Sequence, residues 1–259
     1  MHTFLRKHLY RLKDNNQKAF AVLVDPDKIA PENVPDFISQ LEQCKVDILL
    51  VGGSLIQDNH ITELVPQIKS RTDIPVVLFP GSAQQIVPTA DAILFLSLIS
   101  GRNPDFLIGQ QVLAAPMIRQ ANLEVLATGY MLIDAGNITT ANYMSHTLPI
   151  PHDKPNIAVC TAIAGEMLGH HLIYMDGGSG AQRSISSKMI SAVRKQLEIP
   201  LIVGGGIRSK EEALRIWEAG ADMIVIGNAI EAAEGFSLME EVASVKSHLN
   251  AAIAAGKKR

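Results

Sequence analysis

Apolar residues along the chain gather in short, nearly continuous runs that alternate with longer segments of mixed polarity. Continuous runs rich in Val, Ile and Leu are typical of strands that are buried on both faces, as in a parallel sheet covered by helices. Such runs predict eight strands, at residues 19–24, 46–51, 74–79, 92–97, 124–133, 171–175, 200–204 and 222–227.

Most of the segments between these runs have the spacing of amphipathic helices. Helices are expected at 33–44, 61–70, 105–120, 156–168, 186–198 and 210–220, and an additional helix at 1–14 is expected across the bottom of the sheet. Strands that alternate with helices indicate βαβ units and a parallel sheet. Eight units in a chain of 259 residues match the size of a closed (β/α)₈ TIM barrel, and an open doubly wound sheet is the alternative.

Two segments depart from this alternation. Residues 81–91 have barely two turns of helical pattern before Pro88, so the third unit is expected to contain a short helix or a loop. Residues 134–155 are rich in Asn, Thr, His and Pro and are expected to form an excursion before the next helix. No linker rich in Gly, Pro or Ser interrupts the sequence. We therefore predict one domain over 1–259, a modified TIM barrel with an irregular third helix segment.

Composition limits the classes of function. The net charge is −3 and there is no long basic block, which argues against nucleic acid as a partner. Cys44 and Cys160 lie in apolar contexts without metal-ligand spacing and are expected to be inert core thiols. The sequence has neither the apolar region of a signal peptide nor a membrane span, so a cytoplasmic location is expected. The basic tail 256–259 is expected to be solvated, with a weak peripheral contact to an anionic membrane as the alternative.

In a barrel of this kind the chemistry lies where the strands end and the following loops begin. Asp25 ends the first predicted strand and Ser54 follows the second, which places a carboxylate and a hydroxyl on neighbouring strands. Both groups are hard oxygen ligands, and Mg²⁺ binds one or two such groups while water and substrate phosphate complete its coordination. The alternative for Asp25 is an N-cap or an Asx-turn, although Asp27 and Lys28 suit that role better.

The seventh and eighth predicted strands both lead through glycines into a helix. Gly204, Gly205 and Gly206 follow one strand, and Gly227 with Asn228 follows the other. Glycines allow the backbone to approach a ligand closely, and helix N-termini present free N–H groups to anions. The loops after strands 7 and 8 are the recurrent phosphate site of TIM barrels, so phosphate binding is favoured over tight-turn geometry alone.

The sixth predicted strand ends in the sequence YMDGGSGA. This turn combines one acid, three glycines and two hydroxyl groups: Asp176; Gly177, Gly178 and Gly180; Ser179 and Tyr174. An acid beside a phosphate pocket can accept a proton from a bound hydroxyl, whereas a structural Asp176 would cap the next helix or hold the loop. Asp25 and Asp176 are expected across the barrel mouth from each other. The residues therefore indicate a magnesium-assisted enzyme that acts on a small phosphate ester.

Taken together, the motifs resemble those of the geranylgeranylglyceryl phosphate synthase and heptaprenylglyceryl phosphate synthase family. The matching stretches lie in the family's order between residues 22 and 231: VLVDPDK, LLVGGS, VVLFPGS, GYMLI, YMDGGSGA, IVGGGIRS and IGNAIE. One glycine turn is a weak signal, whereas VDPDK together with VGGS, FPGS and the YMDGGSGA turn is specific. The excursion at 134–155 resembles the larger archaeal-type branch of the family.

This resemblance implies a modified TIM barrel in which a mobile segment replaces the third helix. It implies transfer of a prenyl group from a polyprenyl diphosphate to the 3-hydroxyl of sn-glycerol 1-phosphate, which yields an ether lipid precursor. Geranylgeranyl diphosphate is the first candidate for the prenyl donor. It implies Mg²⁺ at Asp25 and Ser54, with Asp176 and Tyr174 as catalytic candidates. The implied glycerol phosphate contacts are Tyr174, Asp176, Gly177, Gly178, Ser179, Gly180, Gly205, Gly206, Gly227 and Asn228.

The chain departs from the family at Asp176, where Glu is usual and Asp is one methylene shorter. Two other functions stay open: another phosphate-binding barrel enzyme of the sugar-phosphate isomerase type, and a non-catalytic protein that binds glycerol phosphate. If the chain is a prenyltransferase, its prenyl site is expected near the third and fourth units, around Phe79, Phe95, Leu96 and Leu98. The family forms dimers and hexamers, so a homo-oligomer is expected.

Overall fold

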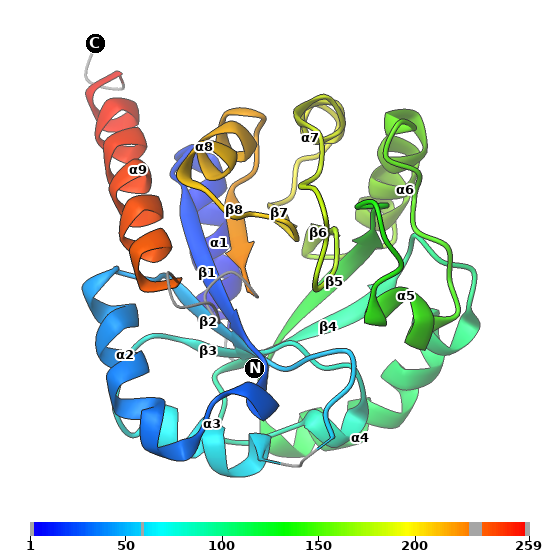
Figure 1. Ribbon diagram of the computed structural model, residues 1–259. Coiled ribbons are helices and arrows are strands. Elements are labelled where there is room, and N and C mark those ends of the chain that lie inside the picture. The colour runs from blue at the N-terminus through cyan, green and yellow to red at the C-terminus, as the bar shows by residue number, and fades with distance from the viewer. Residues whose placement is uncertain (1–2, 58–59, 228–234, 257–259) are drawn as a thin grey trace.

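The computed structural model describes residues 3–57, 60–227 and 235–256 and shows a closed barrel of parallel strands (Figure 1). Each strand pairs with its neighbours in the chain, and β1 closes the barrel against β8, so the closed TIM barrel is confirmed and the open sheet is not found. The strands are β1 (Ala19–Val24), β2 (Ile48–Val51), β3 (Val76–Leu78), β4 (Ala92–Leu98), β5 (Glu124–Leu132), β6 (Leu172–Asp176), β7 (Leu201–Gly204) and β8 (Met223–Ile226).

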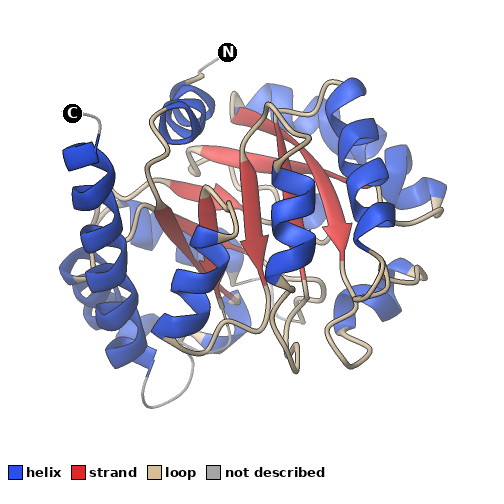
Figure 2. Ribbon diagram, turned by 90° about the horizontal axis from the view of Figure 1, so that it is seen from above, coloured by secondary structure: helices blue, strands red, loops and turns tan. Residues whose placement is uncertain are grey.

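Helices lie around the outside of the strands (Figure 2). They are α1 (Phe4–Asp14), α2 (Val34–Gln43), α3 (Ile61–Lys69), α4 (Gln110–Ala121), α5 (Thr140–Ser145), α6 (Pro155–Met167), α7 (Ser187–Arg194), α8 (Lys210–Glu218) and α9 (Gly235–Gly256). Four short turns join them: η1 (Pro26–Lys28), η2 (Pro31–Asn33), η3 (Ala83–Gln85) and η4 (Asp105–Gly109). Among the helices of the described residues, none combines the length and the apolar composition that crossing a membrane requires.

Alternate residues of the strands face two separate apolar layers. In β1, Phe20, Val22 and Val24 belong to the layer between strands and helices, whereas Ala19 and Ala21 belong to the layer inside the barrel. This division follows from the geometry of a strand, in which successive side chains point to opposite faces. The interior is therefore packed with side chains, as is usual for TIM barrels, and ligand space is left to the carboxyl ends of the strands.

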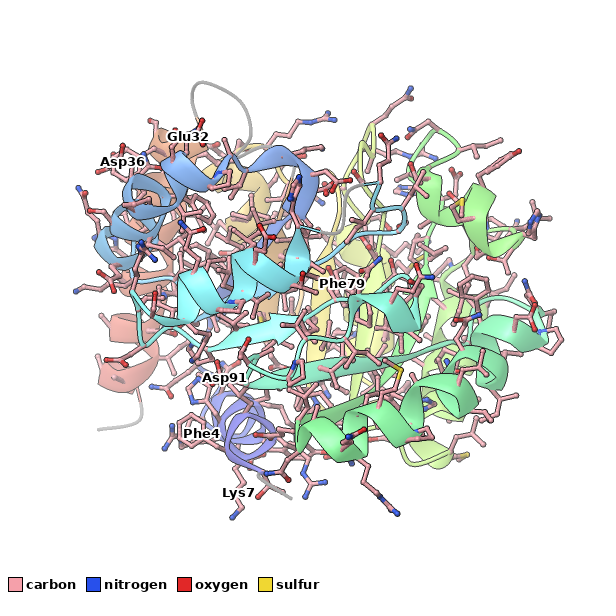
Figure 3. All side chains as sticks on the ribbon, turned by 90° about the horizontal axis from the view of Figure 1, so that it is seen from below. Phe4, Lys7, Glu32, Asp36, Phe79 and Asp91 are labelled. Carbon is pink, nitrogen blue, oxygen red and sulfur yellow. The ribbon has the colours of Figure 1, made fainter. Side chains whose placement is uncertain are left out.

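α1 closes the bottom of the barrel, as the sequence predicts. Its buried side chains belong to the same cluster as the barrel interior: Leu5, Leu9 and Leu12. The Glu124 carboxylate accepts hydrogen bonds from Leu5 N–H at 2.9 Å and from Arg6 N–H at 2.7 Å. N–H groups in the first turn of a helix have no partner within the helix, so this carboxylate holds α1 against β5. Phe4 and Lys7 are exposed on the outer side of the helix (Figure 3).

The third unit is irregular, as expected. β3 has three residues, and the single 3₁₀ turn η3 stands where a helix would follow it. Gln85 of this turn is buried, and its side chain donates to Gly53 O at 3.0 Å and accepts from Gly81 N–H at 3.1 Å. η3 therefore joins the loops that follow β2 and β3 at the barrel mouth.

Several elements differ in extent from the sequence prediction. The ranges predicted for β2 and β8 include Asp47 and Asp222, which precede these strands and bond to the neighbouring strand through their side chains. Residues 105–109 form a π-helical turn, η4, ahead of α4 rather than its first α-helical turn. The helix predicted at 186–198 ends at Arg194. These differences arise because an apolar pattern marks which residues are buried but not where backbone pairing stops.

The excursion at 134–155 contains the short helix α5. A capping box begins this helix, in which the Thr139 and Asn142 side chains bond to each other's backbone N–H groups. A parallel bridge between Ile133 and Ile150 returns the chain to the end of β5. The excursion is therefore fixed to the barrel at both of its ends, and α5 lies between them.

The two cysteines differ in burial. Cys44 is buried, as expected, whereas Cys160 on α6 is exposed, so the prediction of a core thiol is wrong for Cys160. α6 carries apolar residues on all sides, and its sequence therefore does not reveal which face is buried.

Candidate active site

Two adjoining cavities lie at the carboxyl ends of the strands. The larger has a volume of about 200 Å³ and the smaller a volume of about 60 Å³. Five residues line both cavities: Leu23, Asp176, Gly178, Ser179 and Gly227. Asp176 is the acid among them, so ligands placed in the two cavities would meet beside its carboxylate.

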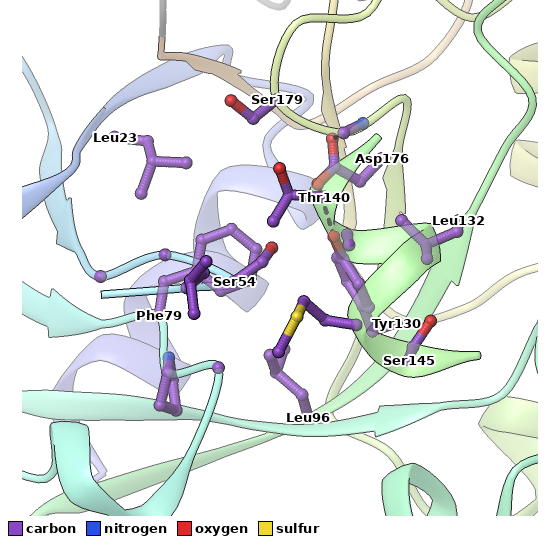
Figure 4. Close-up of a pocket in the computed structure, with 18 of the residues that line it drawn as sticks. Leu23, Ser54, Phe79, Leu96, Tyr130, Leu132, Thr140, Ser145, Asp176 and Ser179 are labelled. Atoms are coloured by element: carbon purple, nitrogen blue, oxygen red, sulfur yellow. Dashed lines mark hydrogen bonds between the residues drawn. The ribbon is translucent and has the colours of Figure 1, made fainter. Parts of the chain in front are cut away.

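The larger cavity has both polar and apolar lining residues, several of which are labelled in Figure 4. We call the part lined by Asp25, Lys28 and Ser54, from the loops after β1 and β2, its polar end. The apolar wall is formed by β4, η4, β5 and α5: Leu96, Leu98, Phe106, Leu132, Ala141 and Met144. Thr140 and Ser145 of α5 border the same space, so the excursion supplies part of the wall. This lining suits a ligand with an anionic head and an apolar tail.

The smaller cavity is rich in glycine, which accounts for five of its thirteen lining residues. Gly178, Gly180, Gly205 and Gly206 have φ values of 82°, 77°, 86° and 71°, in the left-handed region that favours glycine. A Cβ atom at Gly205 would lie 2.6 Å from Gly177 N, closer than real side chains come. Side chains at these positions would distort the loops and fill the space. A narrow site of backbone groups after β6, β7 and β8 suits a phosphate group.

Asp176 is a buried acid held by two donors. It ends β6, pairs with Leu132 of β5 in the ladder, and is 7% exposed. Its Oδ1 accepts from Gly178 N–H at 2.7 Å and its Oδ2 accepts from the Tyr130 hydroxyl at 2.6 Å (Figure 4). Burial raises the pKa of Asp176 above its usual value, and the hydrogen bonds from Tyr130 and Gly178 oppose that rise. An acid with a raised pKa is suited to exchange a proton with a bound hydroxyl.

Three aromatic rings pack together below the cavities. Phe79 stacks on Tyr174 with ring centroids 5.4 Å apart, and Tyr130 meets these rings edge-on at 5.7 Å and 5.4 Å. Burial and the nearby charge of Asp176 raise the pKa of Tyr130 and the pKa of Tyr174 well above the usual value. Both phenols therefore stay protonated, and Tyr130 is the donor in its bond to Asp176. Tyr174 borders the smaller cavity, where the sequence places it.

Asp25 and Ser54, the two predicted metal ligands, both line the polar end of the larger cavity. Asp25 also caps η1, because its Oδ1 accepts from Asp27 N–H at 3.1 Å. The expectation that Asp27 or Lys28 caps this turn is therefore wrong. Asp27 instead accepts from Gln57 N–H at 2.7 Å and joins the loops after β1 and β2.

The donors at this end fit Mg²⁺. One carboxylate and one hydroxyl match a cation that keeps several waters and binds substrate phosphate. Nowhere in the described residues do three His, Cys, Asp or Glu side chains gather into a metal site of the kind that Zn²⁺ prefers. A Cβ atom at Gly53 would lie 3.9 Å from Asp25 Oδ2, so glycine keeps the space beside this carboxylate clear of a side chain.

Not every predicted residue reaches the cavities. Gly177 borders neither of them, and its N–H donates to Gly204 O at 3.0 Å. Asn228 lies outside the described residues. Three of the four residues expected at a prenyl site line the larger cavity: Phe79, Leu96 and Leu98. Phe95 does not line this cavity. It packs on the layer between strands and helices and, with Leu96, lines a third cavity beside η3 and α4.

Several cavity residues were not singled out from the sequence. Tyr130 contacts Asp176, but its only sequence signal was the GYMLI stretch, which does not show the register of β5 against β6. Lys28 and Arg208 place a cation at each cavity. Met144 comes from the excursion, where a polar composition gave no sign of a cavity wall.

Fold and site together define a (β/α)₈ barrel with two cavities at its mouth, one narrow and rich in glycine and one larger and partly apolar. The model of the PcrB family matches residues 13–246. A geranylgeranylglyceryl phosphate synthase from Chitinophaga pinensis is 52% identical over 243 residues, which cover 94% of this chain and 96% of that protein. One from Thermococcus gammatolerans is 42% identical over 222 residues, which cover 85% of this chain and 87% of that protein.

The fold comparison agrees with the sequence comparison. A crystal structure of (S)-3-O-geranylgeranylglyceryl phosphate synthase from Thermoplasma acidophilum, in complex with its substrate sn-glycerol-1-phosphate, matches with a TM-score of 0.89. The two chains are 32% identical, and the match covers 96% of this chain and 100% of the other. This protein therefore belongs to the PcrB family.

Proposed function

We propose that this protein transfers a polyprenyl group from its diphosphate to the 3-hydroxyl of sn-glycerol 1-phosphate, with geranylgeranyl as the first candidate for that group. The observation that carries the proposal is the place of Asp176, in the wall shared by a glycine-lined cavity and a cavity with an apolar wall. One substrate is a small phosphate and the other an anionic group on an apolar chain, so the acid lies where they would meet. The names of the relatives and the ligand of the Thermoplasma acidophilum protein support the same reaction.

The smaller cavity would hold sn-glycerol 1-phosphate. Backbone of the loops at 178–180 and 205–206 would bind its phosphate, which fixes the direction of the glycerol hydroxyls. The 3-hydroxyl would then face Asp176. As its oxygen forms a bond to the first prenyl carbon, the bond from that carbon to diphosphate breaks and the hydroxyl proton passes to the Asp176 carboxylate.

The polar end of the larger cavity would hold the diphosphate. Asp25 and Ser54 would bind Mg²⁺ there, and a bound Mg²⁺ would neutralise the negative charge that grows on the leaving diphosphate. Lys28 lines the same end, so the protein supplies a positive charge there in addition to that of the metal ion. In this arrangement the charge stabilisation would lie on the side of the reacting carbon away from Asp176.

The apolar wall would hold the prenyl chain. Leu96 and Leu98 of β4, Leu132 of β5 and Met144 of α5 border this part of the cavity. Each methylene group that leaves water there contributes about 0.8 kcal/mol to binding. We therefore expect a lower KM for geranylgeranyl diphosphate than for geranyl diphosphate.

A prenyl-transfer assay tests the proposal. Purified protein is mixed with radiolabelled sn-glycerol 1-phosphate and a series of polyprenyl diphosphates, with and without Mg²⁺, and sn-glycerol 3-phosphate is the control acceptor. The proposal predicts labelled lipid only with Mg²⁺ and only from sn-glycerol 1-phosphate. Tight binding of glycerol phosphate without any lipid product would support the non-catalytic binding protein instead.

A homo-oligomer is part of the same proposal. α4 and α6 follow neighbouring strands of the barrel and both expose large apolar side chains: Val112, Leu113 and Met117 on α4, Ile157 and Met167 on α6. Apolar patches of this kind on a folded domain commonly mark contacts between subunits. A Leu113→Asp variant should sediment as a smaller species than the wild type, and an unchanged sedimentation coefficient would move the contact elsewhere.

We also propose a cytoplasmic location, because the chain has two cysteines, both free, as is usual in a reducing compartment. The alternative of a peripheral membrane contact through the basic tail concerns residues 257–259, which lie outside the described residues.

A further inference from the structure

Tyr130 reaches from β5 to the carboxylate at the end of β6, and it lines the larger cavity. We propose that Tyr130 is a positioning residue, whose hydroxyl keeps Asp176 charged and turned toward the hydroxyl of the acceptor. The inference rests on the prenyl transfer proposed above and adds a second residue to the machinery of that reaction.

The geometry leaves the carboxylate able to act. A carboxylate offers about four lone-pair positions on its two oxygens. The Tyr130 hydroxyl uses one on Oδ2 and Gly178 N–H uses one on Oδ1, at 2.6 Å and 2.7 Å. The two donors fix the plane and the rotation of the group, and one position on each oxygen remains for a substrate hydroxyl.

The Tyr130 hydroxyl is itself held in place. Tyr130 is 8% exposed, and its ring meets the rings of Phe79 and Tyr174 edge-on. Because Asp176 has a single methylene between backbone and carboxyl group, its oxygens move little once the strand is fixed. A rigid donor from the next strand therefore sets the position of Oδ2, and misplacement of a reacting group by about 1 Å costs roughly 10²-fold in rate.

The surroundings make this donor important. Asp176 is buried. Among the described residues, no Lys or Arg forms an ion pair with its carboxylate. The other titratable groups that line the two cavities are Asp25, Lys28, Tyr174 and Arg208. Burial raises the pKa of Asp176, and the Tyr130 hydroxyl is the first of the two hydrogen bonds that lower it. Without that bond the acid would take up a proton more readily, and a protonated acid cannot accept the substrate's proton.

The test removes the hydroxyl and keeps the ring, in Tyr130→Phe. We expect kcat at pH 7 to fall roughly 10- to 100-fold while KM for sn-glycerol 1-phosphate changes less than about twofold. The acidic limb of the kcat profile should move to higher pH. Tyr10→Phe on α1 at the bottom of the barrel removes a hydroxyl far from the cavities and serves as the matched control, with unchanged kcat and pH profile.

Repeating the Tyr130→Phe change in an Asp176→Asn variant separates positioning from a general packing effect. In Asp176→Asn, the additional Tyr130→Phe change should lower residual activity by less than about twofold, since the group that Tyr130 positions is no longer a base. The inference is overturned if Tyr130→Phe leaves kcat and the pH profile unchanged, or if it costs the same factor in both backgrounds. If the wild type itself makes no prenylated product, the proposed function fails and this inference fails with it. A productive wild type with an unaffected Tyr130→Phe variant overturns the inference alone.

Discussion

The carboxylates at the two ends of the barrel are held in opposite ways. At the bottom, Asp47, Asp91 and Asp222 each precede a strand, and each accepts a hydrogen bond from a backbone N–H of the neighbouring strand. Each also forms an ion pair, with N–O distances of 2.8, 2.8 and 3.0 Å: Asp47–Lys246, Asp91–Lys69 and Asp222–Arg194. At the mouth, Asp176 is 7% exposed, close to the 5% of Asp222, yet its carboxylate is held by a phenol and one backbone N–H.

This difference sets Asp176 apart from the three ion-paired acids, although not from Glu124, which is buried at the bottom and held by the N–H groups of Leu5 and Arg6. Burial raises the pKa of Asp222 as it raises the pKa of Asp176, and the contacts of Asp222 with Leu201 N–H and Arg194 oppose that rise. An acid that is buried without a cation holds its charge at a cost, and that cost is lowered when it accepts a proton. Burial alone therefore does not separate the two acids. The ion pair of Asp222 at the bottom of the barrel indicates a role in folding, and the place of Asp176 between the two cavities indicates a role in catalysis.

The largest effect is expected at the mouth, for Asp25→Asn. The amide can still cap η1 through its oxygen, but it lacks the charge that binds Mg²⁺. Turnover should fall to background in an assay with saturating Mg²⁺, with the circular dichroism spectrum unchanged. Asp27→Asn, two residues further in the same loop, is the matched control. Near-normal turnover in Asp25→Asn would remove the metal role from Asp25.

Asp176→Asn should lower kcat by about 10²- to 10⁴-fold, the usual contribution of a general base. The amide has the same shape and can keep its contacts with Gly178 and Tyr130, so binding of sn-glycerol 1-phosphate should change little. Calorimetry of binding beside steady-state kinetics checks both expectations. A variant that keeps full kcat would show that another group takes the proton.

At the bottom, the same kind of change should lower stability and leave catalysis intact. Asp222→Ala leaves Arg194 and Leu201 N–H without their partner, and breaking a buried pair costs about 3–5 kcal/mol. Asp222, Asp47 and Asp91 side chains are 8%, 25% and 36% exposed, so the loss on substitution by Ala should decrease in that order. Urea denaturation measures it. Equal losses at the three sites would contradict the dependence on burial.

The smallest effect is a gain in stability at neutral pH from Asp176→Asn, on the order of 1 kcal/mol. Because the pKa of Asp176 is raised in the folded state, the folded protein holds the proton more tightly than the unfolded chain. The stability from that proton is present below the unfolded pKa and is lost as the pH rises through the folded pKa. The variant should therefore exceed the wild type in thermal stability at pH 7 and match it more closely in acid. A variant that is less stable at pH 7 would mean that ionised Asp176 is not costly to the fold.

The sequence predicts the barrel well because its strands are buried on both faces and appear as apolar runs. It also places Asp25, Ser54 and Asp176 correctly, since strand ends in a barrel converge on one face. It does not reveal Tyr130, because contact between β5 and β6 depends on a register that composition does not specify. Nor does it reveal α5, because this helix has no helical spacing of apolar residues. A capping box and a bridge hold it in place instead.

The most direct test of a reactive acid at the mouth is the crystal structure of the complex with sn-glycerol 1-phosphate. The account predicts the phosphate among the backbone groups of Gly178, Gly180, Gly205 and Gly206. It predicts a glycerol hydroxyl within about 2.6–3.2 Å of an Asp176 carboxylate oxygen, while Tyr130 keeps its bond to the same group. A phosphate bound beside Asp25, or a glycerol with every hydroxyl turned away from Asp176, would contradict it.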